Sequence, residues 1–155
     1  MNQCPDLIIR NHPFFHGMKA QHIPVLCKGA CEATYKAGDY LFHEGEPANR
    51  LFLVQSGCVA LESHQPADGT AVLQCIRSAE VIGWSWLFPP FRWHLRARAI
   101  EDTEVVVLDG AHLLAAAEQH RDFGYELMKR VAQLVIHRLR AAEHQLLERE
   151  HETVL

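Results

Sequence analysis

The sequence has no long apolar run. The stretch Leu7–Ile9 is interrupted at once by Arg10, and no stretch of the 155 residues approaches the roughly 18 to 20 apolar residues that a membrane-spanning helix needs. The first residues also lack the basic segment with which a secretory signal begins. We therefore expect a cytoplasmic protein that does not insert into a membrane.

Positive charge is not in excess either. The chain carries 15 Lys and Arg against 19 Asp and Glu, which gives a net charge of −4 at pH 7. Such a balance does not attract nucleic acid or an anionic membrane over the whole surface. Any contact with a polyanion therefore has to be local.

Catalytic and metal-binding motifs are lacking as well. The sequence contains no Gly-x-Ser-x-Gly, no His-Glu-x-x-His and no phosphate-binding P-loop. Its five cysteines are odd in number and irregularly spaced, which argues against a disulfide scaffold. Cys27 and Cys31 are interpreted as small apolar residues; a redox pair or metal site stays open for them, but no second Cys/His pair completes one. We expect neither an enzyme nor a metal site.

What the sequence does contain is a glycine-punctuated stretch between Tyr35 and Val59. Gly38, Gly45 and Gly57 each follow or precede a short run rich in aromatic and β-branched residues. A residue without a Cβ adopts positive φ at no steric cost, so each glycine fits a tight turn. Short antiparallel strands joined by such turns predict a small β-barrel or jelly roll.

The pattern at residues 38–57 is more specific than that. It reads Gly-Asp-x-Leu-Phe-x-Glu-Gly-x-x-Ala-x-x-Leu-Phe-x-Val-x-x-Gly, which closely resembles the cyclic nucleotide-binding domain family of bacterial regulators, including CRP/FNR-like sensor domains, and kinase regulatory subunits. The resemblance implies a mainly β fold with some α: a β-roll barrel with short N-terminal helices over residues 1–110, then a C-terminal helical segment over residues 111–155 that serves as a dimer or partner helix.

Two short helices are expected before the barrel. The first begins at Asp6 and ends near Pro13, because the residue before a proline avoids the helical region. The second spans 18–28, and we expect it to break at Pro24.

The C-terminal segment predicts one long helix. After Gly124 it contains no glycine and no proline. Apolar residues recur at spacings of three and four and form a seam for a partner: Met128, Val131, Val135, Leu139, Ala142 and Leu146. We interpret the seam as a homodimer interface, although docking on another protein stays open. Transcription factors that resemble this chain add a helix-turn-helix behind this helix; the chain ends at Leu155, so we expect no direct DNA binding.

The resemblance also implies a ligand pocket. In the family a glutamate that follows the glycine equivalent to Gly83 accepts from the ribose, and an arginine pairs with the cyclic phosphate. Here Trp84 stands at the glutamate position and Trp93 at the arginine position. An indole N–H cannot accept a hydrogen bond, so we expect that cyclic AMP does not bind in the usual way. The candidate ligand-binding residues are Gly83, Trp84, Ser85, Trp86, Arg92, Trp93, His94 and Arg96.

Three functions fit these patterns. The first is a non-catalytic regulatory module with a remodelled pocket that acts through dimerisation and a partner protein. The second is a genuine sensor of a cyclic or other nucleotide, such as NAD(P)H, in which basic and aromatic side chains hold the ligand. The third is an accessory subunit of a redox enzyme complex such as an NAD-reducing hydrogenase. A purely structural alternative has three arginines paired with acids on the barrel exterior while the tryptophans complete the core. The arginines are Arg92, Arg96 and Arg98, and the acids include Glu80, Glu101 and Asp102.

Overall fold

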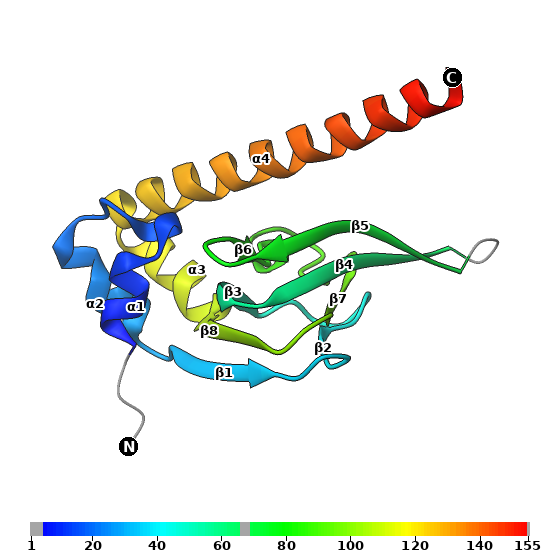
Figure 1. The fold of residues 1–155 in the computed structure, drawn as a ribbon. Helices are drawn as coiled ribbons and strands as arrows, with labels where there is room; N and C mark the ends of the chain where they lie inside the picture. Colours follow the sequence, from blue (N-terminus) through cyan, green and yellow to red (C-terminus); the bar gives the residue numbers. More distant parts are fainter. Residues whose placement is uncertain (1–4, 66–68, 155) are drawn as a thin grey trace.

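Two four-stranded antiparallel sheets form the β-barrel of the molecule (Figure 1). The computed structural model describes residues 5–65 and 69–154. One sheet has the order β1 (Cys31–Tyr35), β8 (Thr103–Asp109), β3 (Arg50–Ser56) and β6 (Val81–Ile82). The other has the order β2 (Tyr40–Phe42), β7 (Arg96–Ala99), β4 (Cys58–Gln65) and β5 (Gly69–Arg77). The mainly β fold predicted from the glycine spacing is confirmed.

The sequence predicts seven strands, and all are present with ends within two residues of the predicted ones: 30–35, 40–42, 51–55, 58–63, 71–76, 95–100 and 103–109. One further strand, β6, was indicated by no pattern, because two residues are too short to show an alternation. It pairs with β3 through Phe52 opposite Ile82 and Leu53 opposite Val81. This short strand delivers the chain directly to Gly83, where the candidate pocket begins.

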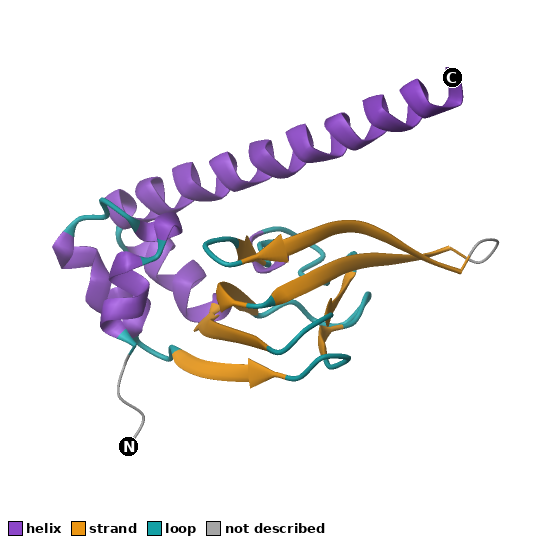
Figure 2. Cartoon of the chain, viewed as in Figure 1, coloured by secondary structure: helices purple, strands orange, loops and turns teal. Residues whose placement is uncertain are grey.

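The helices gather at one end of the barrel and along one side of it (Figure 2). Before the barrel lie α1 (Asp6–Asn11), the 3₁₀ turns η1 (Pro13–Phe15) and η2 (Ala20–His22), and α2 (Ile23–Cys27). The predicted break at Pro24 is wrong in position. The chain breaks before Ile23, and Pro24 lies in the first turn of α2, where its missing N–H needs no partner.

The barrel is followed by two helices, α3 (Gly110–Gln119) and α4 (Arg121–Val154). Asp109 caps α3 by accepting from the N–H groups of Ala111 and His112. The long helix that the glycine-free segment predicted is present. No helix in the described part of the chain is both long and apolar enough to cross a membrane.

The core joins the barrel to the first turns of α4. Phe123 and Leu127 of α4 are fully buried and belong to the same cluster as Leu51, Phe52 and Leu108. Farther along, α4 runs beside the β4–β5 hairpin and diverges from the barrel (Figure 1). The exposed fraction of its apolar side chains rises along this part, from 38% at Val135 to 57% at Leu139 and 60% at Leu146.

A hydrogen-bonded cluster attaches the N-terminal helices to α4. His22 Nδ1 lies 2.9 Å from Glu126 Oε2, and Arg130 Nη2 donates to Glu126 Oε1 at 3.3 Å. Burial raises the pKa of Glu126, but the hydrogen bonds from His22 and Arg130 outweigh it, so the net pKa lies below the ordinary value. The carboxylate is therefore more favoured in the folded chain than in the unfolded one.

Glu126→Gln is expected to lower the free energy of unfolding at pH 7 by about 1 kcal/mol. A lowered folded-state pKa stabilises the fold above the unfolded pKa of about 4.3, and this stabilisation is lost as the pH falls through the folded value. Urea unfolding at pH 7 and near pH 4 should therefore show the difference between wild type and variant shrinking at the lower pH. Glu143→Gln, at an exposed position of the same helix, is the control. An equal difference at both pH values would contradict the prediction.

Candidate functional site

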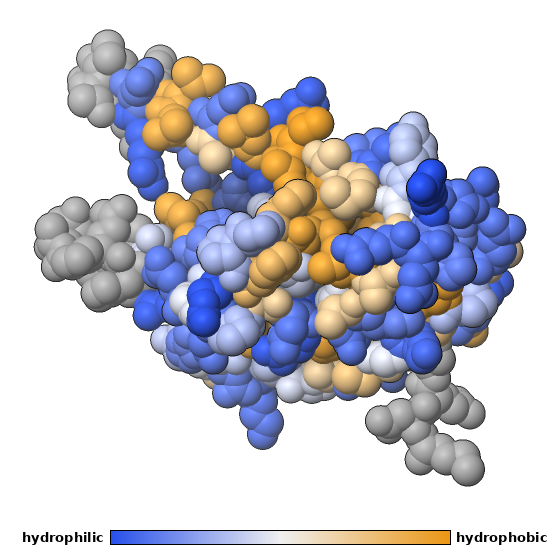
Figure 3. Space-filling model, turned by 180° about the vertical axis from the view of Figure 1, so that it is seen from behind, coloured by the Kyte–Doolittle hydropathy of each residue, from blue (hydrophilic) through white to orange (hydrophobic). Residues whose placement is uncertain are grey.

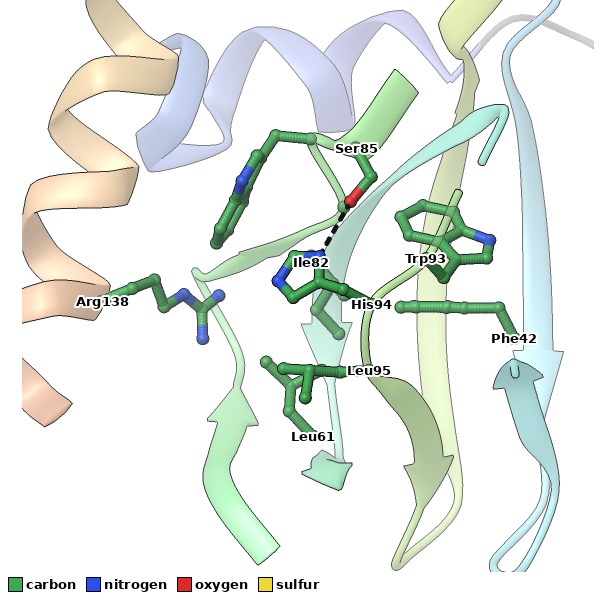
Figure 4. Close-up of a pocket in the computed structure, with 10 residues that line it drawn as sticks. Phe42, Leu61, Ile82, Ser85, Trp93, His94, Leu95 and Arg138 are labelled. Carbon is green, nitrogen blue, oxygen red and sulfur yellow. Dashed lines mark hydrogen bonds between the residues drawn. The ribbon is translucent and has the colours of Figure 1, made fainter. Parts of the chain in front are cut away.

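A small cavity opens inside the barrel beside Gly83. Its volume is about 40 Å³, and residues from both sheets, from the segment between β6 and β7, and from α4 line it (Figure 4). The lining residues are Phe42, Leu61, Ile82, Gly83, Trp84, Ser85, Trp93, His94, Leu95 and Arg138. Of the residues proposed from the sequence, the structure brings together Gly83, Trp84, Ser85, Trp93 and His94.

The base of this cavity, called the inner cavity below, is the indole ring of Trp93 packed on Gly83. Gly83 has φ +98°, and a Cβ at this position would lie 2.8 Å from the carbonyl oxygen of Arg50 and 2.9 Å from the ring of Trp93. Trp93 is 4% exposed, and its ring centroid lies 3.9 Å from that of Phe42. The side chain at the predicted arginine position therefore packs directly against the glycine backbone.

Trp84 is the N-cap residue and Ser85 the first residue of the short 3₁₀ turn η3 (Ser85–Leu87). Trp84, at the predicted glutamate position, is half-buried and lines the cavity. Ser85 Oγ lies 3.5 Å from His94 Nδ1 across the mouth (Figure 4). These groups offer few hydrogen bonds, and the indole N–H of Trp84 can only donate.

Trp86 lies away from the cavity. Its indole N–H donates to the carbonyl oxygen of Gly83 at 2.9 Å, and its ring covers Gly110 at the start of α3 so closely that a Cβ there would lie 2.7 Å from it. It is 2% exposed. Trp86 therefore supports the turn from within the core, and the structure does not place it among the lining residues.

The arginines also point elsewhere. Arg92 is exposed and donates to the carbonyl oxygen of Gly45 at 2.7 Å. Arg96 and Arg98 both pair with Glu62, at 3.3 and 3.1 Å, and the guanidinium of Arg96 lies over the ring of Tyr40. Their acidic partner is thus Glu62 on the neighbouring strand rather than the three acids suggested by the sequence. The register of β4 against β7 sets Glu62 opposite Arg96, and this register was not readable from spacing.

Arg138 of α4 lines the cavity and was missed by the sequence analysis. It is 7% exposed and donates to Gln74 Oε1 at 3.2 Å and to the carbonyl oxygen of Val81. Gln74 Nε2 in turn donates to the Arg138 carbonyl oxygen at 3.0 Å, so α4 is fastened to β5 and β6 at this point. Burial lowers the pKa of Arg138. The available signal was its place seven residues after Val131, on the helix face turned toward the barrel.

A larger cavity continues from the inner one between the barrel and α4. It measures about 440 Å³. The two share Leu61, Trp84, His94, Leu95 and Arg138, so Arg138 stands at their junction. The outer cavity adds Leu73, Gln74, Val135, Leu139, Ala142, Gln145, Leu146 and Arg149.

The apolar seam of α4 borders this outer cavity. Figure 3 shows apolar side chains gathered along α4 and on the barrel beneath it. Val131 does not belong to the exposed seam: it is 2% exposed and packs in the core of its own chain. Ala132 is exposed in its place, because 131 faces the barrel while 132 continues the heptad spacing. The exposed seam then consists of Met128, Ala132, Val135, Leu139, Ala142 and Leu146.

No group of three or more His, Cys, Asp or Glu side chains that could hold a metal ion occurs among residues 5–65 and 69–154. Cys27, half-buried, has its thiol 3.6 Å from Asp6 Oδ1, and Cys31 is exposed on β1. Neither Cys27 nor Cys31 forms a disulfide bond within the part of the chain that the structure describes.

The profile of the cyclic nucleotide-binding domain matches residues 32–120. This stretch is more than half of the chain and contains all of the barrel strands except the first residue of β1, Cys31. The chain belongs to the cyclic nucleotide-binding domain family. In this member the profile ends at the junction between α3 and α4, so the long helix lies beyond the matched residues.

Two curated relatives of this cyclic nucleotide-binding domain are bacterial regulators. The chain is 31% identical over 91 residues to the anaerobic regulatory protein of Bacillus subtilis and 26% identical over 138 residues to the cyclic AMP receptor protein of Thermus thermophilus. The alignments cover 58% and 89% of the chain. They span only 38% and 62% of the relatives' own lengths.

A solved cyclic nucleotide-binding domain from Methylobacillus flagellatus has the same fold. It superposes with a TM-score of 0.80 at 19% identity, over 93% of this chain and 83% of that one. The coverage includes most of α4, so the long helix is part of the shared architecture.

Proposed function

We propose that this chain is a non-catalytic regulatory domain that works as a homodimer and does not hold cyclic AMP through the sugar and phosphate contacts implied by the family. The observation that supports this proposal most strongly is the packing of Trp93 on Gly83. The ring occupies the space next to the glycine backbone, and neither Trp84 nor Trp93 can replace a carboxylate or a guanidinium.

The energetic cost of these two replacements is large. A ribose hydroxyl left unpaired in a buried site costs roughly 1 to 3 kcal/mol, and the loss of a charge-assisted bond to phosphate costs about as much again. Together they weaken binding by about two to four orders of magnitude. Arg92 does not compensate, because it is exposed and bound to Gly45 outside the cavity.

The dimer is supported by the exposed seam of α4. Val135, Leu139 and Leu146 are 38%, 57% and 60% exposed in the single chain, and they follow one heptad phase. A row of large apolar side chains at this spacing is typical of a helix that packs on a second helix. The net charge of −4 favours a signal passed to a partner protein over direct contact with DNA.

Calorimetric titration of the full chain with cyclic AMP tests the proposal. We expect no saturable heat up to millimolar nucleotide, and the same result with cyclic GMP. Binding in the micromolar range that is abolished by Ser85→Pro at the backbone of η3, and retained by the exposed-site control Glu143→Gln, would contradict it.

A further inference from the structure

The guanidinium of Arg138 is buried and forms no salt bridge among the described residues; the nearest acidic influence on it is the charge of Glu80, which acts without direct contact. Its Nε–H has no hydrogen-bond partner in the described part of the chain either. Its two contacts, with Gln74 and Val81, are to neutral oxygens. Burying a cation without an anion carries a large desolvation penalty, which a bound anion would offset.

The surroundings of Arg138 specify what else such an anion must contain. Neither cavity is lined by a single Asp or Glu, whereas Arg138, Arg149 and His94 all lie on their walls. The remaining surface is chiefly aliphatic and aromatic, with Leu61, Leu73, Trp84, Leu95 and Leu139 surrounding the junction. An outer volume of about 440 Å³ is in the range of small-molecule sites.

We propose that the two joined cavities bind an apolar monocarboxylate, such as an arylacetic acid or a medium-chain fatty acid. Its carboxylate pairs with Arg138, and its apolar body lies between α4 and β5. This inference rests on the proposed function, because it names the ligand class of the same pocket. A guanidinium matches a carboxylate through two parallel hydrogen bonds.

A sugar phosphate fits these walls less well. Its hydroxyls would stay unpaired against leucine and tryptophan, at the cost of buried unsatisfied polar groups. An apolar acid needs one guanidinium for its carboxylate and an apolar space for its body, and the junction of the two cavities offers both.

Binding at Arg138 would act directly on α4. The side chain lies on the helix between Val135 and Leu139 of the seam, and it holds the helix to β5 and β6 through Gln74 and Val81. A carboxylate that draws the guanidinium toward itself changes these contacts. The ligand would therefore bias the position of the helix that carries the proposed dimer interface.

The test uses the full chain with phenylacetate and octanoate as probes, followed by calorimetry and by the intrinsic tryptophan fluorescence, to which Trp84 at the junction contributes. Each acid is compared with its neutral amide, phenylacetamide or octanamide. We expect at least one acid to bind about ten- to a hundredfold more tightly than its amide. Arg138→Gln should abolish this preference, Arg138→Lys should keep part of it, and Arg140→Gln, an exposed arginine of the same helix, should leave it unchanged.

Several results would overturn the inference. They are equal binding of acid and amide, wild-type binding by a folded Arg138→Gln chain, tighter binding of inorganic phosphate than of either acid, or no response to either acid at millimolar concentration. Failure of this inference is separable from failure of the proposed function. If the chain binds neither the acids nor cyclic AMP, only the proposed ligand class is contradicted. If it binds cyclic AMP, the proposed function is contradicted.

Discussion

Leu139→Glu is expected to convert the proposed dimer into monomers. Leu139 is 57% exposed in the single chain and lies near the middle of the exposed seam, so a two-fold axis would bring both copies of the new charge into one apolar interface. Each copy loses about 1.5 to 3 kcal/mol of apolar burial and adds an unpaired charge. The dimer dissociation constant should rise more than hundredfold, measured by sedimentation velocity across a dilution series.

Gln133→Glu is the matched control for this change. It introduces the same charge on α4 at an exposed position outside the heptad phase of the seam, and its dissociation constant should stay within a few-fold of wild type. If the wild-type chain is monomeric at every concentration tested, or if both variants dissociate equally, the homodimer is contradicted. Unchanged helical circular dichroism would show that Leu139→Glu acts on association and not on folding.

Gly57→Ala is expected to cause the largest loss of stability of any glycine substitution in the barrel turns. Gly57 joins β3 to β4 with φ +100°, and a Cβ there would lie 2.4 Å from Thr103 Oγ1 and 2.6 Å from the carbonyl oxygen of Asp102. The positive φ alone costs about 1 to 2 kcal/mol, and the overlap with backbone atoms adds to it. We expect a loss of about 3 kcal/mol or more, which corresponds to a fall in Tm of roughly 6 to 12 °C.

Gly38→Ala separates these two contributions. Gly38 has a similar φ of +95°, but a Cβ there would meet no atom within 4 Å. It should therefore lose only the conformational part, about 1 to 2 kcal/mol, in the same denaturant experiment. Equal losses for the two variants would show that crowding at the turn between β3 and β4 is not what requires a glycine.

The barrel could be predicted from the sequence because its signals are local. Gly38 and Gly57 both have positive φ in the structure, and the apolar run between them forms strand β3, whose residues 51–54 are all buried. The long helix was equally readable from the absence of breakers after Gly124. Strand β6 was not, since two residues carry no period.

The candidate site was only partly predictable, because much of it depends on which residues meet across the fold. Trp84 and Trp93 were found through the family pattern at the pocket. Trp86, three residues from Gly83, was indistinguishable from them in sequence, although its ring turns toward Gly110 instead. Arg138 lies more than fifty residues from Gly83, and only the docking of α4 on the barrel brings the two to one cavity.

Val131 shows the limit of periodicity for an interface. Spacings of three and four from Met128 fit both Val131 and Ala132, but Val131 is buried and Ala132 is exposed. Because the first turns of α4 pack on their own barrel, Val131 is buried there and cannot serve a second chain. A helix that contacts both its own barrel and a proposed partner has two apolar stripes, and the sequence does not say which stripe is which.

A crystal structure of the full chain soaked with millimolar cyclic AMP would test most directly whether Trp93 closes the sugar–phosphate site. We predict that the ring stays packed on Gly83 and Phe42 and that no nucleotide lies against the backbone N–H groups of residues 83–85. A nucleotide seated there with its phosphate against these N–H groups, and with the Trp93 side chain displaced, would contradict that prediction.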